Sequence, residues 1–504
     1  MIKTKQFCHK ILANIGTKSA KAFTNLVISL SSDEKSRSVV ELSESPLFHH
    51  QYSSIRDAIA GVGKDESEQR QSMITGRAIA LSELDLPEGC RVLLQTDASS
   101  IVKAHSACLE DRQYVKTNNN VIRKNQPISI GFSISLVNIS PGIGKWSIPL
   151  DIRRVKSDQT ASECAVEQME VLITEEPLSK CFIVNTLDTG YGSPAYLGAV
   201  YGHAHLVNLI RFRHGKKVWL QWADSVTNDS SSASSKKGAP RIYGEQFYLI
   251  GESDKKMYTR KGISYEVNRT SIFDTPHHDY VELEGQTSKG KDLEIQVWRW
   301  NDLLVRSSKG QNMKDKPFDL IASRVKDKKT GKLVFQRTMF VVIHGKQKSE
   351  ITTKQAFEGY RKRYDIEPSI KFAKQKLLLD KYQTPAQQHF DNWLVVVMMS
   401  FWLLFFSKEE MEYSPKKWQQ YKEVNKKAAT KSKAVAEIPL TPNQAKQAAQ
   451  SLFLTLDATP FLPKTSNKGK GRQKDTKIKP RTRYPVVKKS QDKTKIKIKI
   501  EKIE

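Results

Sequence analysis

The sequence predicts an α/β protein in which helices cover a mixed β-sheet. Short runs rich in β-branched residues recur between residues 91 and 213, one helical segment interrupts them, and longer helical segments lie on both sides. Strands and helices that alternate in this way pack as a sheet covered by helices. With 504 residues, of which 38% are apolar, the chain is long enough for roughly two to four domains.

Residues 1–88 are expected to form a helical N-terminal region, and they contain no well-formed helix-turn-helix pattern. Residues 89–213 are expected to form the first part of an α/β core. Its strands are expected at 91–98, 127–138, 146–155, 181–188 and 206–213, and its helix, capped by Ser157, at 157–173.

Residues 214–350 are predicted to be a β-rich insertion. A polar loop at 225–241 is followed by short β-like runs at 247–250, 280–283, 293–300, 320–325 and 333–343. Residues 351–408 return to a helical pattern and are expected to complete the core. Residues 409–504 form a basic C-terminal region with one expected helix, from Thr441 to about Leu456.

An apolar run of 14 residues, WLVVVMMSFWLLFF, extends from Trp393 to Phe406. Because a helix needs roughly 20 residues to cross a bilayer, this run predicts a buried helix instead. Thr384 is the expected N-cap of that helix, and Pro385 its first residue.

The charge balance is strongly basic. The chain has 82 basic and 54 acidic residues, a net charge of +28. Such a charge favours a polyanionic partner, which could be DNA, RNA or an anionic membrane surface; the simpler interpretation is a soluble basic protein. From Lys464 to the end there are 16 basic and four acidic residues, with few apolar ones, so this last segment is expected to be disordered and to follow phosphates.

The five cysteines include no C-x-x-C pair, so we expect reduced thiols, no disulfide framework and no zinc knuckle. The paired histidines near residues 49, 203 and 277 lack cysteine partners or an H-E-x-x-H spacing, and we interpret them as structural or solvent-facing. The sequence also lacks a P-loop and a G-x-S-x-G motif, which argues against ATP use and acyl chemistry.

Four residues carry the most specific motif, with the spacing Y-x2-R-x3-E-x6-K: Tyr360, Arg363, Glu367 and Lys374. On one ideal helix, at about 100° per residue, they would share a narrow face. An acid flanked by an aromatic ring and two cations suits a site that holds both a metal ion and a phosphate backbone. The alternative is a solvated amphipathic helix with charges placed by chance. Because Pro368 disfavours a straight helix, a helix that begins near Glu367, with Pro368 in its first turn, is the competing prediction.

This motif resembles the signature of DDE transposases encoded by bacterial insertion sequences. Further blocks are similar to a cyanobacterial-type branch of that family: LEDRQYVK (109–116), NQPISIG (125–131), IPLDIRRV (148–155), LVNLIRFR (206–213), KKGAPRIYG (236–244) and RYPVVKK (483–489). The resemblance covers the chain from about residue 45 onward.

The resemblance implies a ribonuclease-H-like fold with a catalytic Asp, Asp, Glu triad, which falls on Asp97, Asp188 and Glu367. Asp97 lies on the first expected core strand, and Asp188 ends a later one. The separation of 179 positions from Asp188 to Glu367 agrees with the β-rich insertion expected in this class. Two alternatives stay open: both aspartates could be turn residues at strand ends, and Asp365 or Glu358 could replace Glu367.

The same resemblance implies that the three carboxylates hold two divalent ions, Mg²⁺ by expectation, with Mn²⁺ as a substitute. Arg363 and Lys374 would hold phosphates, and Tyr360 the terminal nucleotide. Trp298 and Trp300 could stack on a flipped base, although we favour core positions for both. The expected partner is double-stranded DNA, as transposon-end inverted repeats and as target.

The expected activity is cleavage at transposon ends followed by strand transfer. We also expect the protein to act as a homodimer on DNA. Its expected location is cytoplasmic and nucleoid-associated, with no membrane association. Three other functions compete with the expected activity. They are a ribonuclease-H-like nuclease that only hydrolyses DNA, a non-catalytic basic DNA-binding protein derived from a transposase, and a membrane-associated basic protein that would rest only on the apolar run 393–406.

Overall fold

The computed structural model describes residues 2–15, 19–117, 127–222, 242–260, 262–287, 290–308, 310–414, 439–456 and 480–487. The polar loop predicted at 225–241 and most of the basic segment from Lys464 onward lie outside these residues. The chain divides into two compact units, each described here by itself. Unit 1 comprises Met1–Leu86, Asp97–Ala165 and Asp365–Glu504, and unit 2 comprises Pro87–Thr96 and Val166–Tyr364.

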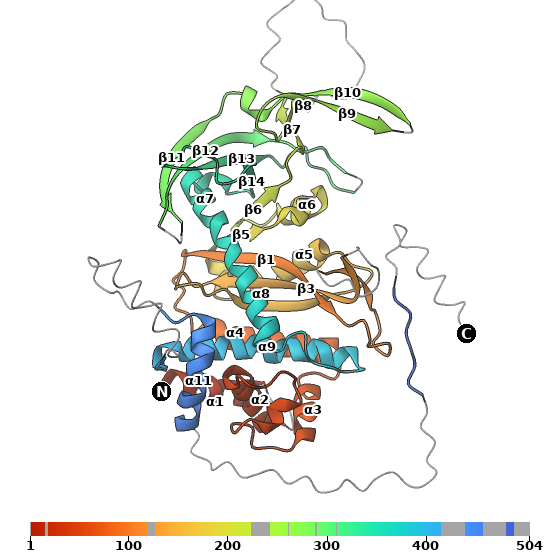
Figure 1. Ribbon diagram of the computed structural model, residues 1–504, viewed down its shortest axis with the longest axis vertical. Helices are drawn as coiled ribbons and strands as arrows, with labels where there is room; N and C mark the ends of the chain where they lie inside the picture. The colour runs from red at the N-terminus through yellow and green to blue at the C-terminus, as the bar shows by residue number, and fades with distance from the viewer. Residues whose placement is uncertain are drawn as a thin grey trace, which may run out of the picture. The chain divides into compact units, whose positions relative to one another are not determined.

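Helices occupy the N-terminal part of unit 1, as predicted (Figure 1). They are α1 (Ile2–Asn14), α2 (Ala20–Ser32), α3 (Tyr52–Ala60) and α4 (Glu66–Ser82). α2 buries Phe23, Leu26, Val27 and Leu30 along one side, which is the spacing of an amphipathic helix. α4 begins with Asp65, whose side chain accepts a hydrogen bond from the Glu68 amide.

The apolar run of residues 393–406 lies inside α9 (Gln387–Ser407), and the prediction of a buried helix is confirmed. By length and composition α9 could cross a membrane, but 94% of its most apolar stretch is buried inside the protein. The predicted start was wrong: Ala386, not Thr384, is the N-cap. Thr384 Oγ1 instead accepts a hydrogen bond from the Ala386 amide (3.1 Å), so the hydroxyl closes a turn before the helix begins.

The helix α5 (Ala161–Leu172) also begins later than predicted. Ser157 does not cap it, because the helix begins four residues after Ser157, whose amide donates to the carboxylate of Asp111. Thr160 and Glu163 form the cap: Thr160 Oγ1 accepts from the Glu163 amide (3.2 Å), and Glu163 accepts from the Thr160 amide (2.7 Å). This reciprocal pair is a capping box.

In unit 1 the strands β2 (Gln113–Lys116) and β4 (Ile148–Val155) both pair antiparallel with β3 (Ile128–Ser140). The strand β1 (Arg91–Val102) is the neighbour of β3, through its second half. β3 and β4 are buried on both faces over most of their length, since α9 covers β4.

In unit 2 the first half of β1 pairs parallel with β5 (Phe182–Leu187), which pairs parallel with β6 (Leu206–Phe212). Four antiparallel strands from the predicted β-rich insertion continue from β6: β14 (Met339–His344), β13 (Phe318–Asp327), β12 (Asp292–Leu303) and β11 (Asp279–Gln286). The same segment forms two small hairpins, β7 (Lys217–Gln221) with β8 (Tyr243–Tyr248), and β9 (Asp254–Arg260) with β10 (Ile263–Arg269).

The strand order is β11-β12-β13-β14-β6-β5-β1-β3-β2, with β4 also on β3. Within unit 2 the first half of β1 pairs with β5, and within unit 1 its second half is the neighbour of β3. This mixed sheet with covering helices is the predicted α/β, ribonuclease-H-like arrangement. In unit 2, α7 (Thr353–Arg361) packs its Ala356, Phe357 and Tyr360 on the sheet.

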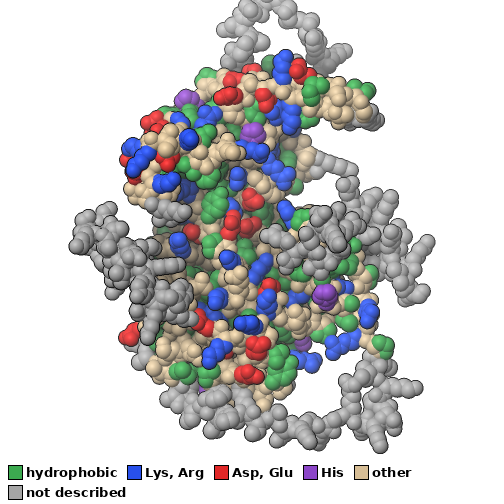
Figure 2. Space-filling view, in the orientation of Figure 1, with side chains coloured by type: hydrophobic (Ala, Val, Ile, Leu, Met, Phe, Trp, Pro, Cys, Tyr) green, Lys and Arg blue, Asp and Glu red, His purple; other side chains and the backbone are tan. Residues whose placement is uncertain are grey.

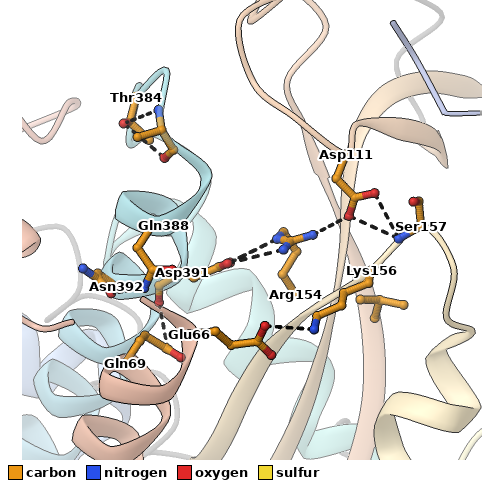
Figure 3. A network of polar contacts seen from close by, with 12 residues as sticks. Glu66, Gln69, Asp111, Arg154, Lys156, Ser157, Thr384, Gln388, Asp391 and Asn392 are labelled. Carbon is orange, nitrogen blue, oxygen red and sulfur yellow. Dashed lines mark hydrogen bonds and ion pairs between the residues drawn. The ribbon is translucent and has the colours of Figure 1, made fainter. Parts of the chain in front are cut away.

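A polar network in unit 1 fixes α9 against β4 (Figure 3). Arg154 is 8% exposed, and its guanidinium contacts the carboxylates of Asp111 (2.6 Å) and Asp391 (3.2 Å). Burial raises the pKa of Asp391, and the nearby Arg154 opposes that rise. A second ion pair, Lys156 with Glu66 (2.9 Å), ties β4 to α4. The IPLDIRRV block is thus a structural element of unit 1.

Candidate active site

Asp97 and Glu367, the first and third of the expected carboxylates, line one pocket of unit 1. The pocket has a volume of ≈ 490 Å³. Its wall also contains Asp380 and three lysines, Lys371, Lys374 and Lys381. Carboxylates bind hard cations and ammonium groups bind phosphate oxygens, so this pocket has the chemistry to hold a phosphodiester beside a divalent ion.

Asp97 lies on β1, directly after the residues that pair with β5. That pairing runs in register from Arg91 opposite Phe182 to Thr96 opposite Leu187. The side chain is half-buried, and Asp97 Oδ1 accepts a hydrogen bond from the Ala98 amide (2.8 Å). The ladder with β5 fixes the backbone immediately before Asp97, which restricts where its carboxylate can point.

Glu367 is the second residue of α8 (Ile366–Gln375), and its side chain is exposed. α7 ends at Arg361, and the 3₁₀ turn η7 (Lys362–Asp365) separates the two helices. The prediction of one straight helix, with the four motif residues on a narrow face, was therefore wrong. A helix that begins near Glu367 is confirmed, and Pro368 is tolerated because the first-turn amides have no acceptor within the helix.

α8 is anchored on the side away from Glu367. Ser369 Oγ donates to the Ser147 carbonyl (2.7 Å) and accepts from Asn138 Nδ2 (3.1 Å). Phe372 packs edge-on against Phe401 of α9, with ring centroids 5.2 Å apart. These buried contacts hold the helix that presents Glu367 to the pocket.

Lys374 connects α8 directly to β1. Its Nζ donates to Ser99 Oγ (2.8 Å) and to the Ser100 carbonyl (2.7 Å). Burial lowers the pKa of Lys374, and the nearby Asp380 partly opposes that effect. Two of the three ammonium protons are thus used to hold the strand two residues beyond Asp97.

Asp188 lies in unit 2, directly after the last residue of β5 and before the turn η3 (Thr189–Tyr191). The strand register pairs Leu187, which precedes Asp188, with Thr96, which precedes Asp97. The side chain of Asp188 is half-buried. Lys216 holds the end of this turn by donating to the Gly192 carbonyl while its ammonium lies 3.6 Å from the Phe212 ring centre.

Tyr360 and Arg363 also belong to unit 2, and both are buried, with 1% and 4% of their surface exposed. Tyr360 lies in the hydrophobic core beneath α7, and among the described residues its hydroxyl has no hydrogen-bond partner. Burial raises the pKa of Tyr360, the charges of Arg363 and Arg211 lower it, and Asp188 raises it. The charge of Asp188 therefore acts on Tyr360 inside the same unit.

The two tryptophans of the expected insertion differ in exposure. Trp300 is 1% exposed and donates its indole N–H to the Thr275 carbonyl (3.2 Å), as a core residue does. Trp298 is half-buried, and it contacts Phe273 and Tyr280.

Within the described residues, no group of three or more His, Cys, Asp or Glu side chains is arranged to hold a metal ion. The donor chemistry of the pocket still fits such an ion, because Asp97 and Glu367 both offer carboxylate oxygens to one space. Asp380 and Ser99 were missed as site residues. Asp380 follows the end of α8 at a point where no sequence pattern marks it, and Ser99 is recognisable only through its contact with Lys374.

A pocket that combines carboxylates with lysines on a ribonuclease-H-like sheet is typical of nucleases and polynucleotidyl transferases that cut DNA. The family model described as DDE superfamily endonuclease matches residues 11–267, about half of the chain, and the protein belongs to this family. The matched range includes Asp97 and Asp188 but ends before Glu367. No curated protein matches the sequence. Membership indicates a nuclease or transposase type of enzyme with DNA as its substrate, in a superfamily that generally uses divalent metals.

Proposed function

We propose that the protein is a DNA transposase that cleaves DNA at the ends of a transposable element and joins those ends to target DNA by phosphodiester transesterification. The observation that carries the proposal is the pocket that Asp97 and Glu367 share in a member of the DDE superfamily. The register of β1 with β5 supports Asp188 as the second carboxylate, because Thr96 and Leu187 are paired and each precedes one aspartate.

Asp97, Asp188 and Glu367 would hold the divalent ions, two by expectation, with Mg²⁺ as the natural ion and Mn²⁺ as a substitute. When bound, such ions activate the attacking oxygen and stabilise the leaving oxygen of a phosphodiester. The chain itself supplies the positions of these carboxylates: β1 orients Asp97, and α8, fixed by Ser369 and Lys374, orients Glu367.

The lysines of the pocket would divide two tasks. Lys371 and Lys381 are exposed at the pocket wall and would neutralise phosphate oxygens of the DNA. Lys374 has two hydrogen bonds to β1, so we assign it a positioning role in addition to the predicted phosphate contact. Tyr360 and Arg363 are kept as proposed contacts of the DNA end, although burial leaves each only a few per cent of its surface for that purpose.

The proposed partners are inverted repeats at transposon ends and a target duplex, bound by a homodimer in the cytoplasm at the nucleoid. The surface charge is compatible with a polyanionic partner. Figure 2 shows basic side chains over the visible surface, with acidic ones between them. The basic excess of +28 provides a general attraction to phosphates but selects no sequence.

A strand-transfer assay tests the proposal. The substrate is a labelled duplex that carries the DNA flanking the gene and ends in a free 3′-hydroxyl, offered with a supercoiled plasmid and Mg²⁺. We expect labelled DNA joined to the plasmid, no joining in EDTA, and little joining with a scrambled end. Shortened duplex without joining would identify a hydrolytic nuclease. Binding without cleavage or joining would identify a non-catalytic DNA-binding protein.

A further inference from the structure

The hairpin of β9 and β10 has a sheet of its own within unit 2 and extends from it as an arm (Figure 1). The strands pair antiparallel in an unbroken register that places Tyr258 opposite Tyr265. Its large apolar side chains are unusually exposed: Ile263 by 71%, Met257 by 59% and Tyr265 by 44%. A solvated surface of this kind on a soluble domain indicates a binding role.

The two faces of the hairpin differ in chemistry. Residues opposite each other in an antiparallel pair share a face, and successive pairs alternate between faces. One face, named here the aromatic face, carries Lys256, Val267 and the stacked rings of Tyr258 and Tyr265, whose centres are 6.1 Å apart. Lys256 Nζ lies 5.6 Å from the centre of the Tyr258 ring.

The acidic residues of the hairpin do not offset the cation on the aromatic face. Asp254, at the base of that face, is held by the guanidinium of Arg269, and this hydrogen bond lowers the pKa of Asp254. Glu266 lies on the opposite face, where it pairs with Lys255 at 3.4 Å. Over residues 254–269 the sequence has five basic and two acidic residues. The aromatic face is thus positively charged and apolar at once.

We propose that the aromatic face of the β9–β10 hairpin binds the DNA of the proposed reaction, with Lys256 on a phosphate and the tyrosine rings against sugars or bases. This inference rests on the proposed function and adds a second DNA contact outside the carboxylate pocket. A two-stranded ribbon fits the major groove of B-DNA, and aromatic rings stack on the exposed bases of single-stranded DNA without strict sequence selection. The hairpin's positive charge complements DNA, whereas a second copy of this +28 chain would repel it.

The test measures binding of a labelled duplex with a single-stranded tail to the full chain by fluorescence anisotropy at several salt concentrations. Lys256→Gln is expected to reduce the slope of log affinity against log salt by about one phosphate contact. Tyr258→Ser with Tyr265→Ser is expected to weaken binding by roughly 5- to 100-fold, the effect of losing aromatic stacking. The matched control is Thr259→Val with Ser264→Ala, which changes a hydrogen-bonded pair (2.9 Å) on the opposite face and is expected to leave binding unchanged.

Unchanged affinity and salt slope in the aromatic-face variants, while the wild type binds and cleaves DNA, would overturn this inference and leave the proposed function intact. Loss of a dimer in light scattering, with DNA affinity unaffected, would also overturn it and assign the face to a second copy of the chain. A wild type that neither binds nor cleaves DNA would instead overturn the proposed function.

Discussion

Lys374 Nζ donates a hydrogen bond of 2.8 Å to Ser99 Oγ, and this contact joins the helix of Glu367 to the strand of Asp97. A second bond from the same nitrogen reaches the Ser100 carbonyl at 2.7 Å. The lysine of the Y-x2-R-x3-E-x6-K motif therefore has a structural partner inside the protein. This explains why the motif could require a lysine seven residues after its glutamate: two helical turns bring the lysine alongside β1.

Replacing Lys374 by methionine separates positioning from phosphate binding. The change removes both hydrogen bonds, and we expect a loss of about 1–2 kcal/mol in the free energy of unfolding together with reduced DNA cleavage. If Lys374 acts mainly by positioning, the salt dependence of DNA binding stays as in the wild type. The matched variant is Lys371→Met, at an exposed position of the same pocket. It should reduce the slope of log DNA affinity against log salt by about one phosphate contact and leave the free energy of unfolding unchanged. A reversed pattern would make Lys374 the phosphate ligand.

Tyr360 can be tested by two substitutions. Tyr360→Phe removes a buried hydroxyl that has no partner among the described residues, so stability should change by less than about 0.5 kcal/mol. Tyr360→Ala removes a ring from the core beneath α7 and should lower the free energy of unfolding by about 3–5 kcal/mol. Chemical denaturation measures both. If Tyr360→Phe is as stable as the wild type but transfers strands poorly, the hydroxyl contacts DNA; normal transfer would confine Tyr360 to packing.

The ion pair between Arg77 and Asp151 should be essential to unit 1. Both side chains are almost completely buried, and the contact is 3.0 Å long. Arg77→Met removes one positive charge next to the buried Asp151 carboxylate. We expect it to lower the free energy of unfolding by about 3–5 kcal/mol. The double variant Arg77→Met with Asp151→Asn should recover part of this loss, because the uncompensated charge is gone. If Arg77→Met alone is as stable as the wild type, then Arg153, whose guanidinium lies 2.8 Å from the Asp151 carboxylate, is sufficient to compensate that charge.

His344 predicts a dependence of stability on pH. It ends β14, is completely buried, and burial lowers its pKa to about 3, with the charges of Lys316 and Lys348 acting in the same direction. In the unfolded chain a histidine titrates near 6.5. Between about pH 6.5 and 3 the unfolded state therefore binds a proton that the folded state does not, so stability falls as pH falls, by about 1.4 kcal/mol per unit. Melting temperatures of wild type and His344→Gln from pH 7 to 5 measure this slope. Equal slopes would contradict the assignment.

Much of the fold could be predicted because its strongest signals are local. The β-branched runs that became β1, β3, β5 and β6 and the apolar run inside α9 are buried elements whose composition alone distinguishes them. The hairpin β9–β10 was missed, because a strand exposed on both faces has no hydrophobic alternation. The predicted helix starts at Ser157 and Thr384 were wrong for a different reason: Thr160 and Glu163 cap α5, and the Thr384 hydroxyl closes a turn with the Ala386 amide before α9 begins.

The candidate site was predictable only in part. Strand-end position and the family motif led to Asp97, Asp188 and Glu367, and the structure places Asp97 and Glu367 at one pocket. The roles of the other motif residues depend on long-range packing, which spacing does not encode. Tyr360 is buried in the core beneath α7, and Arg363 is buried within η7, the turn that ends one residue before α8 begins.

The central claim is that Asp97, Asp188 and Glu367 act together on one phosphodiester. The most direct test is nicking of a labelled duplex that carries the flanking element end, in Mg²⁺, by Asp97→Asn, Asp188→Asn and Glu367→Gln, with Glu358→Gln and Asp365→Asn as matched acidic controls. We expect each of the first three to lose nicking by at least about 100-fold while DNA binding persists, and both controls to cut like the wild type. Undiminished nicking by Glu367→Gln, or its loss in either control, would contradict the proposed triad.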